Sequence, residues 1–138
     1  MVTLTDQTTR WTRWTARIIS AFILAYVLLM LGGYAYNLLT LGVADPYAVE
    51  DVSQMESLPP ILMFISAFAL AAAFRWERLG GWVTLLLQLG VVVLLFIDNP
   101  TFEDFPRRAL PYGLVVIIVL PAILFLISAS RSAREHTA

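Results

Sequence analysis

One charged break interrupts a long apolar tract in the middle of the chain. The tract runs from residue 58 to residue 97, and the break is the stretch Phe74-Arg75-Trp76-Glu77-Arg78-Leu79-Gly80-Gly81-Trp82. Each flank approaches the roughly 20 apolar residues that a helix needs to cross a bilayer. The stretch therefore predicts the tight turn of a transmembrane helical hairpin.

The composition requires an apolar environment for part of the protein surface. Hydrophobic residues make up 59% of the 138 residues, well above the roughly 45–50% that is usual in soluble domains. A soluble chain of this length could not bury so much apolar surface, so lipid must solvate part of it. We therefore expect a single integral membrane domain over residues 1–138.

Apolar segments on either side of the hairpin complete a predicted all-α bundle of four transmembrane helices. The expected membrane spans are residues 15–40, 58–75, 80–97 and 109–129. The first apolar segment, Ile18 to Ala44, carries no charge and is longer than a hydrocarbon core of ~30 Å requires at ~1.5 Å per residue. That length also argues against a cleaved signal peptide, whose apolar region is shorter.

The arginines predict how the bundle is oriented, because cytoplasmic ends of membrane proteins carry an excess of basic residues. With the N-terminus inside, only Arg107 and Arg108 lie outside. The inner side holds the other seven arginines: Arg10, Arg13, Arg17, Arg75, Arg78, Arg131 and Arg134. We therefore predict a multi-pass protein of the inner (cytoplasmic) membrane with both termini in the cytoplasm.

The first outer loop is predicted to contain a short amphipathic helix. Asp45-Pro46 is a helix start signal. The apolar residues that follow share one helical face: Ala48, Val49, Val52 and Met55. Such a helix lies flat in the membrane interface. The carboxylates of this loop are interpreted as a solvated face, with cation binding as the alternative.

Arginine and tryptophan gather at the predicted inner surface. Three arginines near the N-terminus are spaced i, i+3, i+7 on one helical face, beside two tryptophans. Tryptophan prefers the membrane interface and arginine prefers headgroup phosphates. We therefore assign interfacial anchoring to seven residues: Arg10, Trp11, Arg13, Trp14, Arg17, Trp76 and Trp82. A specific lipid or partner site near the N-terminus is the alternative.

Small residues indicate where helices pack. The second span is rich in alanine, so it is predicted to lie at the centre of the bundle with Ala67 and Ala71 as contact residues. Gln88 is the most polar group deep in the bilayer, and it is interpreted as an interhelical hydrogen-bond partner or as a ligand-facing group. Pro121 is expected to kink the last helix.

Motifs of membrane enzymes and pumps are absent from the sequence. The apolar parts of the four spans contain no ionisable residue, although proton relays and ion paths depend on such residues. The chain has no cysteine, and its one histidine, His136, lies in the C-terminal tail. No nucleotide-binding loop, serine elbow or zinc motif occurs. We therefore expect no enzyme activity, no catalytic or metal-binding residue, no cofactor and no nucleic-acid partner.

The hairpin stretch resembles a known family. Ser57-Leu58-Pro59-Pro60 leads an apolar helix that is followed by Arg75-Trp76-Glu77-Arg78-Leu79-Gly80-Gly81. This pattern resembles small four-helix prokaryotic integral membrane proteins that carry a domain of unknown function and have a comparable turn of tryptophan, charged residues and two glycines. The resemblance covers residues 15–128, with its specific part at 57–82, and it implies an architecture but no activity.

The leading functional hypothesis is a non-catalytic accessory or assembly subunit of a larger membrane complex. It rests on small-residue helix faces, interfacial aromatic residues and spans without charge. The expected partners are the lipid bilayer and other membrane subunits, and a homo-oligomer is also compatible. The alternative is a carrier or binder of a lipophilic molecule, such as a quinone, carotenoid or lipid, in a cavity near Gln88 and Pro121. A membrane enzyme that acts through its outer carboxylates is a third interpretation.

Overall fold

The computed structural model describes residues 4–45, 54–98 and 105–135. These residues form α1 (Leu4–Leu41), α2 (Gln54–Ala73), α3 (Glu77–Asp98) and α4 (Phe105–Glu135). The expected all-α architecture of four helices is therefore confirmed for the described residues. The predicted amphipathic helix of the first loop falls largely on residues 46–53, which lie outside the described part of the chain.

Length and composition allow three of the helices to cross a membrane. The apolar segments are Gln7–Leu41, Glu77–Asp98 and Ala109–Ala133. A helix needs about 20 apolar residues to cross the hydrocarbon core, so these segments indicate that the chain associates with a membrane. α2 contributes the shorter apolar segment Ser57–Ala73, which at ~1.5 Å per residue is about 25 Å long against a core of ~30 Å.

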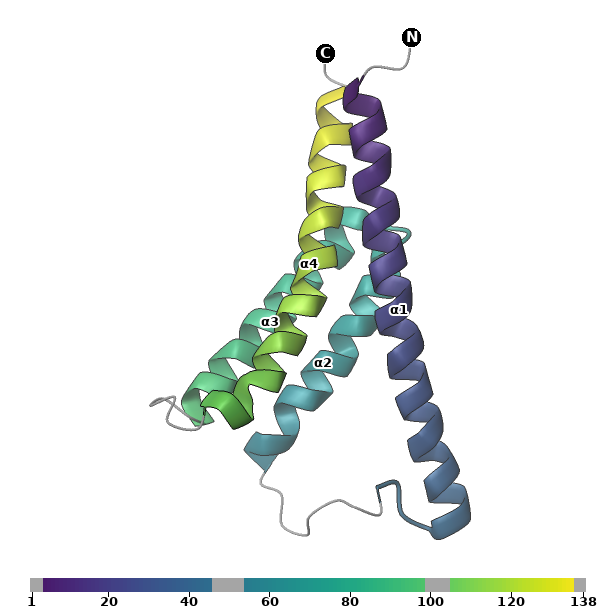
Figure 1. The fold of residues 1–138 in the computed structure, drawn as a ribbon, viewed down its shortest axis with the longest axis vertical. Coiled ribbons are helices and arrows are strands. Elements are labelled where there is room, and N and C mark those ends of the chain that lie inside the picture. Colours follow the sequence, from purple (N-terminus) through teal and green to yellow (C-terminus); the bar gives the residue numbers. More distant parts are fainter. Residues whose placement is uncertain (1–3, 46–53, 99–104, 136–138) are drawn as a thin grey trace.

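The first and last helices extend beyond the predicted spans. α1 already begins at Leu4, and α4 runs from Phe105 to Glu135. The predicted span boundaries lie where apolar composition stops, whereas the helical backbone continues through the polar residues beyond them. α1 and α4 consequently continue side by side past the point where α2 turns into α3 (Figure 1).

Prolines lie inside two of the helices. α2 begins at Gln54, four residues before the predicted span, so Pro59 and Pro60 lie in its second turn. They remove only hydrogen bonds to carbonyls of the first turn, and the helix continues through them. α4 likewise continues through Pro111 and Pro121, and it changes direction along its length (Figure 1).

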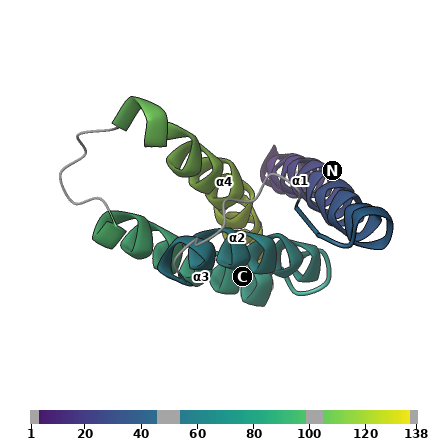
Figure 2. The same cartoon turned by 90° about the horizontal axis from the view of Figure 1, so that it is seen from below.

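The helices pack as a hairpin with two further helices against it. α2 and α3 form the hairpin, α4 packs on α3, and α1 packs mainly on α4. α1 begins and α4 ends at the end of the bundle that contains the α2–α3 turn (Figure 1), which we call the turn end. At the opposite end α1 diverges from α2, as two perpendicular views show (Figures 1 and 2).

The α2–α3 turn is short and is closed by backbone hydrogen bonds. The Trp76 amide donates to the carbonyl of Ala72 at 2.9 Å, and the Gly80 amide donates to the carbonyl of Trp76 at 2.9 Å. The predicted turn stretch is thus divided in two: residues 74–76 make the connection, and Glu77 already begins α3. Glu77 therefore belongs to the first turn of α3 and not to the connection.

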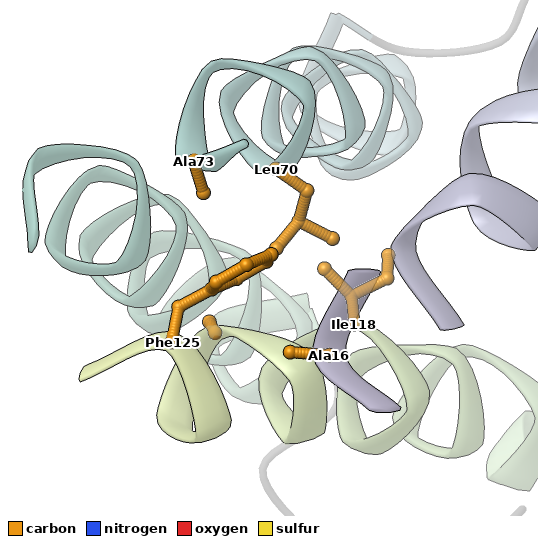
Figure 3. Close-up of a cluster of buried hydrophobic side chains, with 6 residues drawn as sticks. Ala16, Leu70, Ala73, Ile118 and Phe125 are labelled. Atoms are coloured by element: carbon orange, nitrogen blue, oxygen red, sulfur yellow. The ribbon is translucent and has the colours of Figure 1, made fainter. Parts of the chain in front are cut away.

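The apolar core lies near the turn end, between α1, α2 and α4. Phe125 of α4 is fully buried and reaches toward Leu70 of α2 (Figure 3). Its ring meets the ring of Phe74 edge to face, with centroids 6.1 Å apart. The buried cluster comprises Ala16, Leu70, Ala73, Ile118, Ala122 and Phe125. Alanine at three of these positions lets the helix backbones approach closely, as is usual between helices in lipid.

The half of α1 that points away from the turn end is mostly exposed, and only Met30, Tyr34 and Asn37 in it are half-buried. Its last buried residue is Val27, and no residue from 28 to 41 is buried. Gly32 and Gly33 have no neighbouring atom within 4 Å of an added Cβ. The large exposed residues of this half are Leu28, Leu29, Leu31, Tyr36, Leu38, Leu39 and Leu41. α1 is therefore held by the rest of the chain at one end only.

Candidate functional site

A polar cluster joins the helices at the turn end, and we call it the Glu77 cluster: Arg13, Arg17, Glu77, Ser128 and Ser132. Arg13 Nε lies 2.6 Å from Glu77 Oε1, and Arg17 Nη2 lies 3.7 Å from the same oxygen. The Ser128 hydroxyl donates a hydrogen bond to Glu77 Oε2 at 2.7 Å. Arg13 Nη2 donates to Ser132 Oγ at 3.1 Å. Both oxygens of the carboxylate are therefore engaged, and α1, α3 and α4 are tied together.

The partial charges at two helix termini favour the charged groups of this cluster. Glu77 is the first residue of α3, where the positive end of the helix dipole favours a carboxylate. Arg17 Nη2 donates to the backbone carbonyl of Phe74 at 3.4 Å, just beyond the last residue of α2, where a cation is favoured. The cluster thus joins α1, α3 and α4 and also contacts the turn that follows α2.

The carboxylate is more deeply buried than the arginines that surround it. The Glu77 side chain is 13% exposed, against 35% for Arg13 and 38% for Arg17. Arg13 Nε makes no hydrogen bond despite its short distance to Glu77 Oε1, so that contact is an ion pair whose strength is mainly electrostatic. Two guanidinium groups surround one carboxylate, which leaves the cluster with one excess positive charge at the protein surface.

The arrangement is suited to holding helices in place. One oxygen of the Glu77 carboxylate accepts a hydrogen bond from Ser128 and the other contacts two guanidinium groups, so the carboxylate has little capacity left for an external ligand. Among the residues that the structure describes, no three His, Cys, Asp or Glu side chains come together as a metal site. The chemistry that the cluster can offer to an outside group is attraction of an anion by its excess positive charge.

Two glycines allow the helices to reach the distances that this cluster requires. A Cβ added at Gly80 would lie 2.5 Å from the backbone nitrogen of Ala73, which shows how closely α3 approaches α2. A Cβ added at Gly81 would lie 2.9 Å from Leu126 Cγ, in α4. The paired glycines that the sequence placed in the turn therefore serve two different helix contacts.

Gln88 makes the polar contact between α2 and α3 in the middle of the bundle. Its Nε2 donates to Ser66 Oγ at 2.6 Å, and the Ser66 hydroxyl donates to the carbonyl of Met63 at 2.8 Å. Gln88 is buried, and its Oε1 has no hydrogen-bond partner. The interhelical contact anticipated for Gln88 is present, with one acceptor left unsatisfied.

The predicted packing residues lie at different depths. Ala67 and Pro121 are fully buried, and Ala71 is partly buried. Gln88 lies on α3 and bonds to α2, whereas Pro121 lies on α4. The two residues named for a carrier cavity therefore belong to different helices.

All four tryptophans lie toward the turn end, and each is more than half exposed: Trp11, Trp14, Trp76 and Trp82. Arg10 is also exposed, whereas Arg13 and Arg17 turn toward Glu77. The residues predicted as anchors are thus divided between an outward-facing group and an ion-paired group. The outward-facing part of α1 forms an open hollow lined by Gln7, Arg10, Trp11, Trp14 and Ile18.

Sequence reasoning did not identify Glu77 or Ser128 as partners of the N-terminal arginines. A signal for Glu77 was present, because it lies between Arg75 and Arg78 and is one of few acidic residues on the predicted inner side. A lone carboxylate among many arginines is a natural candidate for an ion pair. Ser128 carried no such signal, since a serine near the end of an apolar helix is common and its partner depends on helix packing.

Comparison with known proteins assigns the chain to a family. The family described as a domain of unknown function (DUF7670) matches residues 5–138. The chain belongs to this family. The match includes the Glu77 cluster, the paired glycines and the outward face of α1. No curated protein and no solved structure matches the chain.

Proposed function

We propose that this member of the DUF7670 family is a non-catalytic accessory or assembly subunit of a larger membrane complex in a prokaryotic cell. In this proposal four helices cross the cytoplasmic membrane, with both termini in the cytoplasm and an amphipathic helix in the first outer loop. The turn end, with its exposed tryptophans and its arginines, then lies at the cytoplasmic surface. The arginine distribution and the position of the tryptophans support this placement.

The observation that carries the subunit proposal is the unpartnered half of α1. Residues 28–41 include no buried position, although their side chains are almost entirely apolar. The rest of the molecule packs its helices around a buried core, so this half is an exception within the chain. A helix fixed at one end and largely apolar beyond it presents an extended surface to an apolar helix of another subunit.

Small residues on this surface favour a protein partner over lipid alone. Gly32 and Gly33 have open space around them, and Ala35 is exposed. Within a bilayer, helices associate where small residues let their backbones approach, since lipid solvates leucine as well as protein does. Leu29 and Leu39 project from the same half and would pack around such a contact.

The subunit proposal is tested by photo-crosslinking in native membranes. A photoreactive amino acid replaces Leu29 or Leu39 on α1, and Leu86, an exposed residue of α3, serves as the matched control. We expect one identified membrane protein to be crosslinked from both α1 positions and not from Leu86. Crosslinks only to lipid, or equal crosslinking from all three positions, would refute the proposal, and crosslinks between copies of this chain would replace it with a homo-oligomer.

The proposed orientation is tested separately by cysteine labelling, because the natural chain contains no cysteine. Ala44→Cys lies beyond the end of α1, and Ser130→Cys lies near the turn end. Both positions are exposed. A membrane-impermeant maleimide added to intact cells should label the first variant and not the second. The opposite pattern would invert the topology.

A carrier of a lipophilic molecule is the second candidate, and one observation favours it. The Oε1 atom of Gln88 is buried without a hydrogen-bond partner, and a buried acceptor of this kind costs stability unless a donor reaches it. A hydroxyl group on a bound lipophilic molecule would supply that donor, as would a bound water. Native mass spectrometry of the chain after mild extraction distinguishes the two functions, since a carrier retains a discrete lipophilic mass that Gln88→Leu reduces.

A further inference from the structure

The open hollow near the start of α1 brings a positively charged, an amide, two aromatic and one aliphatic side chain together on the protein surface. Its volume is about 730 Å³. Its lining residues are spaced i, i+3, i+4, i+7 and i+11 along one face of α1: Gln7, Arg10, Trp11, Trp14 and Ile18. This face is distinct from the face that bears Ala16 and packs into the core.

Arg10 is the charged group of this hollow. Arg13 and Arg17 are held by Glu77, whereas Arg10 is exposed and has no ion-pair partner among the described residues. At 3.6 residues per turn, Arg10 and Arg17 lie almost in line along α1, so the excess positive charge of the Glu77 cluster adds to the charge of Arg10. None of the described lining residues is acidic. The hollow therefore attracts an anion.

The order of the lining residues along the helix matches the order of chemical groups in a phospholipid. Gln7 and Arg10 are nearest the helix start, Trp11 and Trp14 follow, and Ile18 begins the apolar part of α1. From Gln7 to Ile18 the helix rises about 16 Å at ~1.5 Å per residue. Indole rings prefer the glycerol and headgroup level of a bilayer, and isoleucine prefers the acyl chains.

We propose that this hollow binds an anionic phospholipid of the cytoplasmic leaflet. Arg10 pairs with the lipid phosphate, and the Gln7 amide is placed to donate a hydrogen bond to the headgroup. Trp11 and Trp14 flank the glycerol region, and the acyl chain lies against Ile18. The inference rests on the proposed orientation in the membrane but not on the existence of a partner subunit.

The test measures lipid retention by the full chain. The protein is reconstituted in bilayers that contain equal amounts of phosphatidylglycerol and phosphatidylcholine, and native mass spectrometry measures the lipids that remain bound after release. We expect preferential retention of phosphatidylglycerol. Arg10→Gln should weaken that retention about fivefold, which corresponds to the ~1 kcal/mol that one basic residue contributes at an anionic membrane surface. Excess inorganic phosphate should leave the lipid bound.

Arg131→Gln is the matched control, because it removes an exposed arginine of α4 outside the hollow. Circular dichroism verifies that both variants keep their helices. A second pair compares Trp14→Leu with Trp82→Leu, and only the first should reduce retention. The proposal would be overturned if Arg10→Gln and Arg131→Gln reduced lipid retention equally or if the two lipids were retained equally. Displacement of the bound lipid by phosphate would also overturn it. Crosslinking from the other half of α1 can succeed or fail independently of these results.

Discussion

Replacing Gly80 by alanine should destabilise the protein, although alanine is the better helix former. In an open helix the change from glycine to alanine stabilises by up to ~1 kcal/mol. At Gly80 the new Cβ would lie 2.5–2.6 Å from three atoms of Ala73, two of them backbone. To restore a contact of 3.4 Å, α2 and α3 must separate by about 0.9 Å next to their short turn. Overpacking of this kind costs roughly 1–3 kcal/mol, so we expect a net loss of up to about 2 kcal/mol.

The same substitution at Gly90 is the control, since it lies in the same helix. A Cβ there would lie 3.7 Å from Leu62 Cδ1, an ordinary van der Waals distance. Gly90→Ala should therefore leave stability unchanged or raise it by up to ~1 kcal/mol. Both variants are solubilised in detergent micelles and unfolded by titration with a denaturing detergent. Circular dichroism measures the loss of helix during the titration. If Gly80→Ala stabilises the protein as much as Gly90→Ala does, the close approach of α2 and α3 is not a feature of the native fold.

Two further predictions concern the polar contacts. Glu77→Gln removes the charge that holds Arg13 and Arg17, and we expect a loss of about 1–2 kcal/mol, because the arginines are more than one-third exposed and can recover part of their solvation. A double-mutant cycle with Arg13→Gln in the same unfolding assay should give a coupling energy of at least ~0.5 kcal/mol, and purely additive effects would contradict the ion pair. Gln88→Leu should cost about 1 kcal/mol or less, because it removes one interhelical hydrogen bond and also removes an unsatisfied acceptor. Loss of function in a stably folded Gln88→Leu variant would show that Gln88 contacts a ligand.

The helical architecture could be predicted because lipid leaves few alternatives to an apolar segment. A run such as residues 79–97 has no charge and is long enough to cross a bilayer, and helices satisfy their own backbone hydrogen bonds there. The short connection at residues 74–76 followed from one charged break between two such runs. The ends of α1 and α4 were less predictable, because hydropathy marks where a segment leaves the bilayer and does not show where the helix ends.

The candidate site could not be predicted in the same way, since it depends on helix packing. Arg13 and Arg17 are separated from Glu77 by about sixty residues, and they meet only because α1 packs beside the α2–α3 turn. An amphipathic sequence pattern indicates which residues share a face, but it does not identify the helix opposite that face. The arginines were therefore assigned to headgroups as one group, whereas the structure divides them between Glu77 and the outward-facing hollow.

The position of the Glu77 cluster at the turn end explains why α1 is fixed at that end and unpartnered at the other. The polar contacts that Arg13 and Arg17 make with Glu77, Ser132 and Phe74 lie near the turn end. Its core residue Ala16 lies at the same level. Beyond Val27 no described residue of α1 up to Leu41 is buried, so separating that half from α2 removes little packing within the chain. The proposed partner helix would therefore displace few internal contacts there, while the Glu77 cluster keeps the start of α1 and its hollow in place.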